Sequence, residues 1–235
     1  MSEFVFHEFA PLLPKELLER AAKLSPAQLC DGMKGLGIPC DGCAPAEILP
    51  VARGMKVLGT AYTIRSAGGN NFPVHVALYD PRVMPGYVMV IAGQAAEERC
   101  YMGDLIASTA KAIGLEGIVV DGYVRDREGI SRMGYPVFAR GFLQRGPSKI
   151  EAGEINGEVR LGDLPVKPGD LVMGDDDGIT VVPRERLEEV LAAAEKKQDY
   201  EEKRRVSIAE YERCRLAGEA RPQLAPQWVQ DMQKG

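Results

Sequence analysis

One stretch of the sequence, GDLIASTAKAIGLEGIVVDGYVRD at residues 103–126, restricts the fold more than any other. It predicts a loop, a helix of about ten residues, a glycine turn, a buried strand and a second loop. This order is typical of open α/β sheets, where ligands bind beyond the carboxyl ends of the strands. The amides of the predicted helix start favour an anion, while Asp121, Arg125 and Asp126 follow the strand. The stretch therefore indicates a site for a small anionic substrate and a divalent metal.

The composition limits the classes of protein and partner that fit this chain. With 235 residues, 45% of them hydrophobic, it is expected to form either one large globular domain or one domain with extensions. A net charge of −5 without a basic block argues against nucleic acid as a partner. No apolar run is long enough to cross a membrane, and the N-terminus lacks the pattern of a signal peptide. We therefore expect a cytoplasmic protein that does not bind membranes.

Proline, glycine and charge patterns divide the chain into three predicted parts. Residues 1–24 form an N-terminal arm and helix, residues 25–205 an α/β domain, and residues 206–235 the end of a C-terminal helix and a tail. Phe4, Phe6 and Phe9 of the arm are candidate anchors on a neighbour. A long charged helix runs from Pro183 and closes at Gly218, and its polar second half is either solvated or reaches another subunit.

Local patterns predict the remaining elements. Helices are expected from Pro14, from the capping box at Ser25–Gln28, and over residues 72–79 and 127–133. Strands are expected over residues 55–65, 87–93 and 135–140. Asn156-Gly157 and Asp176-Asp177-Gly178 each predict a hairpin turn.

The cysteines carry no clear signature of a site. There are five, an odd number that is consistent with reduced thiols. Cys40 and Cys43 have CxxC spacing, but zinc requires further ligands, and His7 and His75 are the only histidines. We therefore interpret the pair as loop cysteines.

Several motifs taken in order give the chain a resemblance to a known family. They are GTAYTI, MPGYVMVI, the 103–126 stretch, GYPVFARG and VKPGDLVMGDDDGITVVP, followed by a charged helix. Over residues 25–205 the chain resembles the family of the regulator of ribonuclease activity A and the 4-hydroxy-4-methyl-2-oxoglutarate/4-carboxy-4-hydroxy-2-oxoadipate aldolases. The resemblance implies a β-rich, swivelling-domain-like α/β sandwich with a long C-terminal helix, assembled as a homotrimer or homohexamer.

The resemblance also implies a function. The aldolases are lyases of aromatic compound degradation that use Mg²⁺ or Mn²⁺ to release pyruvate and a second 2-oxo acid, and they decarboxylate oxaloacetate. Their RD pair binds pyruvate and the metal, which corresponds here to Arg125 and Asp126, and the counterpart of Asp104 orients a metal-bound water. Since all three side chains are present, the resemblance favours an aldolase. The alternatives are a non-catalytic ribonuclease-regulating protein and a lyase acting on another 2-oxo acid.

Further site residues follow from the same resemblance. The amides of Gly103, Asp104, Leu105 and Ile106 hold the substrate carboxylate, and Glu201 or Glu202 of a neighbouring subunit reaches the site. Retro-aldol cleavage stores charge as a pyruvate enolate, which a divalent cation and the Arg125 guanidinium would stabilise. Met102 departs from the family pattern, because an aromatic residue is common at that position. The wall of the pocket is therefore expected to differ from that of the relatives, which affects the identity of the substrate more than the type of reaction.

Other polar residues have simpler interpretations. Asp121 precedes a glycine and is expected to close a turn, and Asp175, Asp176 and Asp177 are expected to serve the hairpin. Asn70 and Asn71 either approach the substrate or stabilise their loop. Lys111 lies within a predicted helix, and nothing marks it as a Schiff-base lysine.

Overall fold

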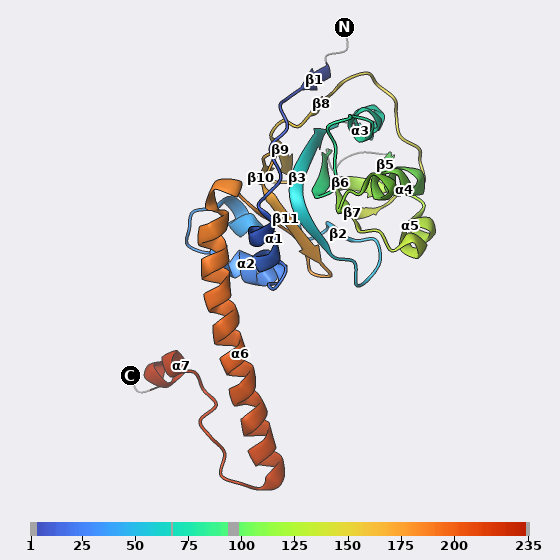
Figure 1. Cartoon of the computed structure of the whole chain (residues 1–235). Coiled ribbons are helices and arrows are strands. Elements are labelled where there is room, and N and C mark those ends of the chain that lie inside the picture. The colour runs from blue at the N-terminus through green and yellow to red at the C-terminus, as the bar shows by residue number, and fades with distance from the viewer. Residues whose placement is uncertain (1–3, 67, 94–98, 234–235) are drawn as a thin grey trace. The chain divides into compact units, whose positions relative to one another are not determined.

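The computed structural model describes residues 4–66, 68–93 and 99–233 (Figure 1). By their contacts the residues form two compact units, Met1–Ala194 and Glu195–Gly235. The helices are α1 (Lys15–Ala21), α2 (Pro26–Met33), α3 (Phe72–Leu78), α4 (Asp104–Ile113), α5 (Arg127–Met133), α6 (Leu187–Ala217) and α7 (Gln227–Met232), with 3₁₀ turns η1 (Pro39–Gly42) and η2 (Arg184–Arg186).

The first unit is built on a mixed sheet in the strand order β1-β8-β3-β4-β6-β7-β2. Strand β11 also pairs with β3, β12 pairs with β11, and β5 pairs with β6. The strands are β1 (Phe4–Phe6), β2 (Leu49–Pro50), β3 (Val57–Arg65), β4 (Tyr87–Ala92), β5 (Cys100–Met102), β6 (Gly117–Val124), β7 (Val137–Phe142), β8 (Gly153–Ile155), β11 (Leu171–Asp175) and β12 (Gly178–Val182). A separate hairpin joins β9 (Val159–Leu161) to β10 (Leu164–Val166). The predicted β-rich α/β fold with a long C-terminal helix is confirmed.

The centre of the sheet is parallel, through β3, β4, β6 and β7. All six residues of β4 are buried, as expected for a central strand covered on both faces. Helix α4 packs against β6 and α5, whereas α2 packs against β11 and β12. The stretch at residues 103–126 thus forms the predicted helix and buried strand, and Gly114 ends α4 in the left-handed conformation, at φ 92°.

The capping box and one hairpin agree with the predictions from sequence. The Ser25 hydroxyl accepts from the Gln28 amide at 3.2 Å, and the Gln28 side chain accepts from the Ser25 amide at 3.0 Å. Strands β11 and β12 pair across Asp175 and Gly178, and the amide of Asp177 donates to the Asp175 carboxylate at 3.0 Å. Asp175 therefore stabilises the turn itself, whereas the Asp176 carboxylate accepts from the Gly54 amide at 2.8 Å.

The hairpin predicted at Asn156-Gly157 is wrong. Strand β8 pairs with β1 and β3, whereas β9 pairs with β10, so the segments on either side of Asn156 go to different sheets. The left-handed conformation of Asn156, at φ 60°, does turn the chain. Its amide donates to the Thr63 carbonyl at 2.7 Å, and its side chain donates to the Glu8 carbonyl, so the turn serves long-range contacts.

The turn predicted at Asp121 is also wrong, because β6 continues through it to Val124. The Asp121 carboxylate is buried, yet it is paired with the Arg140 guanidinium and accepts from the Gly162 amide at 2.9 Å. These partners offset the cost of burying a charge inside a strand.

Two of the predicted arm anchors, Phe4 and Phe9, pack on their own chain, and an anchoring role on a neighbour stays a prediction. The Phe9 ring stacks on Tyr62 with centroids 5.1 Å apart, and Phe4 meets Phe72 edge-on at 6.0 Å. Phe6 is 52% exposed, and residues 1–3 of the predicted arm lie outside the described residues.

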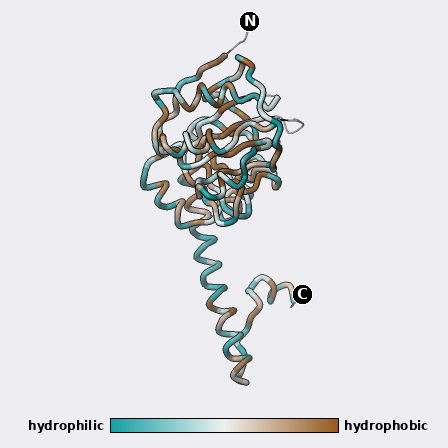
Figure 2. Tube along the Cα trace, turned by 90° about the vertical axis from the view of Figure 1, so that its right-hand side faces the viewer, coloured by the Kyte–Doolittle hydropathy of each residue, from teal (hydrophilic) through white to brown (hydrophobic). Residues whose placement is uncertain are grey.

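The long helix α6 has 31 residues and belongs to both units. In the first unit, Leu187, Val190, Leu191 and Ala194 pack in a core with α1, α2 and the β11–β12 hairpin. The later turns are mostly hydrophilic (Figure 2). In the second unit, the Arg204 guanidinium donates to the Leu224 carbonyl at 2.9 Å, and Trp228 remains 62% exposed. None of the helices within the described ranges is long and apolar enough to cross a membrane.

Candidate active site

A pocket of about 330 Å³ lies where β5 leads into α4 and where β6 leads into α5. Its far wall comes from α3 and from the segment after β7. The lining residues are Asn71, His75, Met102, Gly103, Asp104, Leu105, Ile106, Arg125, Asp126, Pro147 and Lys149. The pocket therefore brings together every residue that the sequence analysis predicted for the site on α4 and after β6.

The two loops that carry the acidic side chains are joined by their backbones. The Arg125 amide donates to the Met102 carbonyl at 2.9 Å, which holds the end of β6 beside the end of β5. The Asp104 amide, at the first position of α4, points toward the Asp126 carboxylate with N and Oδ2 3.4 Å apart. The start of α4 and the Asp126 carboxylate thus face the same space, where the helix amides and dipole favour an anion.

Two glycines leave room for the carboxylates. A Cβ atom on Gly103 would lie 2.1 Å from Oδ2 of Asp126, and a Cβ atom on Gly129 would lie 2.7 Å from Oδ2 of Asp104. Cβ atoms in real proteins essentially never approach a non-bonded heavy atom more closely than 3.0 Å. The carboxylates of Asp126 and Asp104 can therefore occupy their positions only because residues 103 and 129 are glycines.

Asp126 has an unfavourable backbone conformation. It precedes α5 with φ 59° and ψ 39°, in the left-handed region that residues other than glycine rarely adopt. Such a conformation costs about 1 kcal/mol or more and is concentrated at functional sites. The ion pair of Asp126 with Arg125, at 3.4 Å from Oδ2 to Nε, joins two side chains that are each about two-fifths exposed. An exposed pair contributes little stability, so it does not offset the cost of this backbone.

The opposite wall of the pocket carries two nitrogen bases that the sequence analysis did not predict, His75 and Lys149. The Nδ2 atom of Asn71 donates to Nε2 of the His75 ring at 3.3 Å. Burial, with a further effect of the positive charge of Lys149, lowers the pKa of His75. Asn71 directly precedes α3 and His75 lies four residues later, about one helical turn away, which sequence spacing could have indicated. Lys149 lies in an irregular segment and carries no such signal.

The two asparagines have different roles. Asn70 stabilises the loop, because its side chain donates to the carbonyls of Ile150 and Ala152, at 2.9 and 3.1 Å, and accepts from the Ile150 amide. Asn71 lines the pocket, and its buried Oδ1 atom has no hydrogen-bond partner among the residues that the structure describes. A buried acceptor without a partner is costly, so a ligand donor in the pocket would stabilise it.

The donor set fits an open divalent metal site. Among the described residues, no group of three or more His, Cys, Asp or Glu side chains could enclose an ion. The pocket instead offers the carboxylates of Asp104 and Asp126. Mg²⁺ commonly binds through one or two carboxylates together with water and substrate oxygens. These residues are therefore suited to Mg²⁺ or Mn²⁺ shared with a substrate, and not to an ion held by protein alone.

Residues 26–181 match the sequence model of a single family, described as RraA-like and as Aldolase/RraA. The chain belongs to the Aldolase/RraA family. The matched range includes every residue that lines the pocket, whereas the N-terminal arm and α6 lie outside it. The resemblance noted from sequence motifs is therefore confirmed.

Individual relatives within the Aldolase/RraA family carry different names. The chain is 37% identical over 165 residues to a Halalkalibacterium halodurans protein with the provisional name 4-hydroxy-4-methyl-2-oxoglutarate aldolase, covering 70% of this chain and 78% of that protein. It is 29% identical to Streptomyces coelicolor RraAS2, titled an unusual member of the RNase ES inhibitor RraA family, with a TM-score of 0.72 over 82% of this chain and 98% of that one. A Pseudomonas syringae structure, at 24% identity, shares the fold with a TM-score of 0.71 over 90% of this chain and 97% of that one.

Three other features considered in the sequence analysis are not among the residues that line the pocket. Glu201 and Glu202 are on α6 in the second unit, where Glu201 pairs with Arg205 at 3.2 Å, and their role at a neighbouring subunit stays a prediction. Cys43 lies close to Cys30, with sulfurs 2.6 Å apart, and not to its CxxC partner Cys40. Lys111 donates to the Met133 carbonyl at 2.9 Å, which gives it a structural partner away from the pocket lining.

Proposed function

We propose that this protein is a divalent-metal-dependent pyruvate aldolase, a lyase that cleaves 4-hydroxy-4-methyl-2-oxoglutarate or 4-carboxy-4-hydroxy-2-oxoadipate and also decarboxylates oxaloacetate. The observation that carries the proposal is the convergence of Asp104, Arg125 and Asp126 with the first-turn amides of α4 in a single pocket. The provisional aldolase name of a relative at 37% identity supports the same reaction class.

Different residues of the pocket would contribute to substrate binding and to charge stabilisation in retro-aldol cleavage. The amides at the start of α4 would bind the carboxylate of the pyruvate half, as helix N-termini bind anions. The guanidinium of Arg125 would donate to the keto oxygen and stabilise the negative charge that develops there. When bound at Asp126, a divalent cation would supply further Lewis-acid stabilisation of the same oxygen.

Asp104 is suited to the proton transfer. Its carboxylate would act through a water to accept the proton of the C4 hydroxyl, while the C3–C4 bond breaks and its electron pair forms the pyruvate enolate. The C4 hydroxyl carbon becomes the carbonyl of the second 2-oxo acid. Oxaloacetate follows the same route with carbon dioxide as the leaving group, so a single electron sink serves both reactions.

The opposite wall would bind the other half of the substrate. Lys149 supplies a positive charge, and Asn71 and His75 supply polar atoms at the same wall. These groups suit the carboxylates carried on C4 of the proposed substrates, which pyruvate lacks. We further propose a homotrimer or homohexamer, in which Glu201 or Glu202 reaches the pocket of a neighbouring subunit.

A second candidate is a non-catalytic regulator of a ribonuclease. The likeness to Streptomyces coelicolor RraAS2, which is covered to 98%, favours it. The two candidates differ in whether the pocket converts a substrate into products. The test is pyruvate release from 4-hydroxy-4-methyl-2-oxoglutarate, from 4-carboxy-4-hydroxy-2-oxoadipate and from oxaloacetate, with Mg²⁺ or with EDTA, for the wild type and Arg125→Ala. Metal-dependent release that is lost in Arg125→Ala is expected. No release from any of the three by the folded wild type would favour the regulator, and release from oxaloacetate alone would indicate a lyase for another 2-oxo acid.

A further inference from the structure

The N-terminal arm, defined here as residues 4–10, covers the outer edge of β8. Strand β1 pairs in parallel with β8, Phe4 with Gly153 and Phe6 with Ile155, while β8 pairs with β3 on its other side. The His7 amide extends the pairing by donating to the Ile155 carbonyl at 3.0 Å. Without the arm, β8 would be a three-residue edge strand held on one side only.

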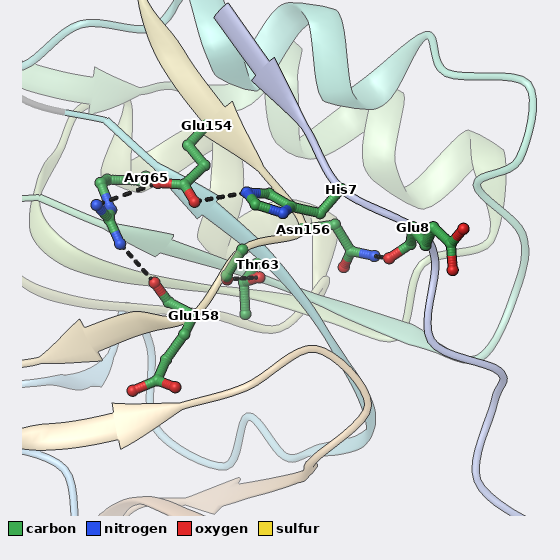
Figure 3. Close-up of polar contacts among 8 residues, drawn as sticks. His7, Glu8, Thr63, Arg65, Glu154, Asn156 and Glu158 are labelled. Atoms are coloured by element: carbon green, nitrogen blue, oxygen red, sulfur yellow. Dashed lines mark hydrogen bonds and ion pairs between the residues drawn. The ribbon is translucent and has the colours of Figure 1, made fainter.

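A polar cluster joins the arm to β8 and β3 (Figure 3). The His7 Nε2 atom lies 2.6 Å from Oε1 of Glu154, and the other carboxylate oxygen pairs with Arg65 Nη1 at 3.1 Å. Arg65 in turn donates to the Glu158 carbonyl at 2.7 Å. The Glu154 side chain is only 20% exposed, so this cluster is better shielded from solvent than a typical surface pair.

The arm also contacts the segments that carry the far wall of the pocket. The edge-on contact of Phe4 is with Phe72, which is the first residue of α3 and directly follows Asn71. Helix α3 and β8 approach so closely that a Cβ atom on Gly153 would lie 2.3 Å from Cγ of Pro73. The arm therefore holds α3 and β8 at the place where they meet.

The segment before β8 leads directly into the pocket. It contains Lys149, and it is fastened to the loop before α3 by the Asn70 side chain and by the Asn71 amide, which donates to the Ser148 carbonyl at 3.1 Å. Asn71, His75 and Lys149 thus stand on two segments that the arm keeps together. By contrast, the start of α4 and the end of β6 have their own mutual hydrogen bonds.

From these contacts we propose that the N-terminal arm is a positioning element that sets the wall of Asn71, His75 and Lys149 against the carboxylates on C4 of the substrate. This inference rests on the proposed function. Phe4 and His7 are the positioning residues, and neither touches the substrate. The arm lies outside the range matched by the family, so this feature belongs to the chain itself and not to the matched domain.

If the arm positions this wall, loss of the arm contacts should weaken the binding of only the substrate half that carries the C4 carboxylates. In Phe4→Ala and His7→Ala, the KM for 4-carboxy-4-hydroxy-2-oxoadipate should rise roughly three- to tenfold, as expected for loss of a contact worth about 1 kcal/mol. The value of kcat should stay within about twofold, and the inhibition constant of pyruvate, which has no C4 carboxylate, should not change. His7→Gln keeps a donor for Glu154 and should restore most of the wild-type KM.

Val5→Ala is the matched control, because Val5 lies on the same strand and is exposed, whereas the Phe6 ring packs on Phe4 with centroids 5.1 Å apart. Hydrogen exchange by mass spectrometry adds a readout that does not depend on turnover. Peptides covering residues 69–79 and 147–155 should exchange faster in Phe4→Ala and His7→Ala, while those covering residues 103–126 should not. Unchanged exchange in the first two regions, or equal changes of KM and the pyruvate inhibition constant, would overturn the inference. If the wild type has no aldolase activity, the proposed function fails, and the exchange data still decide whether the arm holds the wall.

Discussion

Replacing Gly103 with alanine should disable the pocket without unfolding the protein. The backbone of Gly103 is extended, with φ −138° and ψ −162°, so alanine is compatible with it. The new Cβ atom would lie 2.1 Å from Oδ2 of Asp126 and 3.1 Å from Cγ of Arg125. To reach an ordinary contact of about 3.4 Å, the carboxylate must move by roughly 1 Å or rotate away from the pocket.

This change would displace both Asp126, the proposed metal donor, and Arg125, the proposed pyruvate-binding residue. A displacement of about 1 Å at a catalytic group can cost roughly 100-fold in rate, so kcat/KM for pyruvate release should fall at least that far. The melting temperature should change little, because the Asp126 side chain is 41% exposed and can move into solvent. Coupled pyruvate assays at saturating Mg²⁺, together with thermal unfolding, measure both quantities.

Gly146→Ala is the matched control for Gly103→Ala. Its Cβ atom would lie 3.4 Å from Nη1 of Arg125, which is an ordinary van der Waals contact, and activity should stay near the wild-type value. If Gly103→Ala retains wild-type kcat/KM, or if Gly146→Ala loses as much activity as Gly103→Ala, the placement of the two side chains in one reaction pocket is refuted.

Three further predictions concern other parts of the structure. Gly129→Ala should stabilise α5 by up to about 1 kcal/mol, because alanine favours a helix more than glycine does. The same change should lower kcat/KM, because the new Cβ atom would press on Asp104. Denaturant unfolding and steady-state kinetics measure the two effects, and an unchanged kcat/KM would refute the clash. Burial raises the pKa of Asp170 to about 6, so between about pH 4 and 6 the folded protein keeps a proton that the unfolded chain releases. The free energy of unfolding of the wild type relative to Asp170→Asn should therefore fall by about 2 kcal/mol as the pH rises through that window, and a rise would contradict it. Burial and the Cys30 thiol raise the pKa of Cys43 to about 12. Iodoacetamide at pH 8 should therefore alkylate the exposed Cys40 at least about tenfold faster than Cys43, as measured by peptide mass spectrometry. Equal rates for the two cysteines would contradict this prediction.

Features that depend on neighbouring residues could be predicted from the sequence. The capping box at Ser25, the hairpin at Asp175–Gly178 and the helix and strand of residues 103–126 follow from local hydrogen bonding and periodicity. Asp104, Arg125 and Asp126 were predicted as site residues from motif resemblance, and the structure places them in one pocket. They meet because β5 and β6 are neighbouring parallel strands whose carboxyl ends lie at one edge of the sheet.

Features that depend on distant partners could not be predicted. Asp121 stays in a buried strand because Arg140 and the Gly162 amide satisfy its carboxylate, and neither partner is close in sequence. Local sequence patterns at Asn156 predict a hairpin, because they contain no information about its hydrogen bonds to Thr63 and to the N-terminal arm, which are distant in sequence. Lys149 was missed for the same reason, since only the fold brings its irregular segment to the pocket.

We propose that the pocket stabilises a pyruvate enolate with the help of a divalent metal at Asp126. The most direct test is the exchange of the methyl protons of pyruvate in D₂O, followed by NMR, because an enolate takes up solvent deuterium at C3. The wild type with Mg²⁺ or Mn²⁺ should catalyse this exchange, and EDTA or Asp126→Asn should abolish it. Folded wild-type protein that leaves the methyl protons unexchanged with either metal, or exchange that survives in Asp126→Asn, would contradict the account.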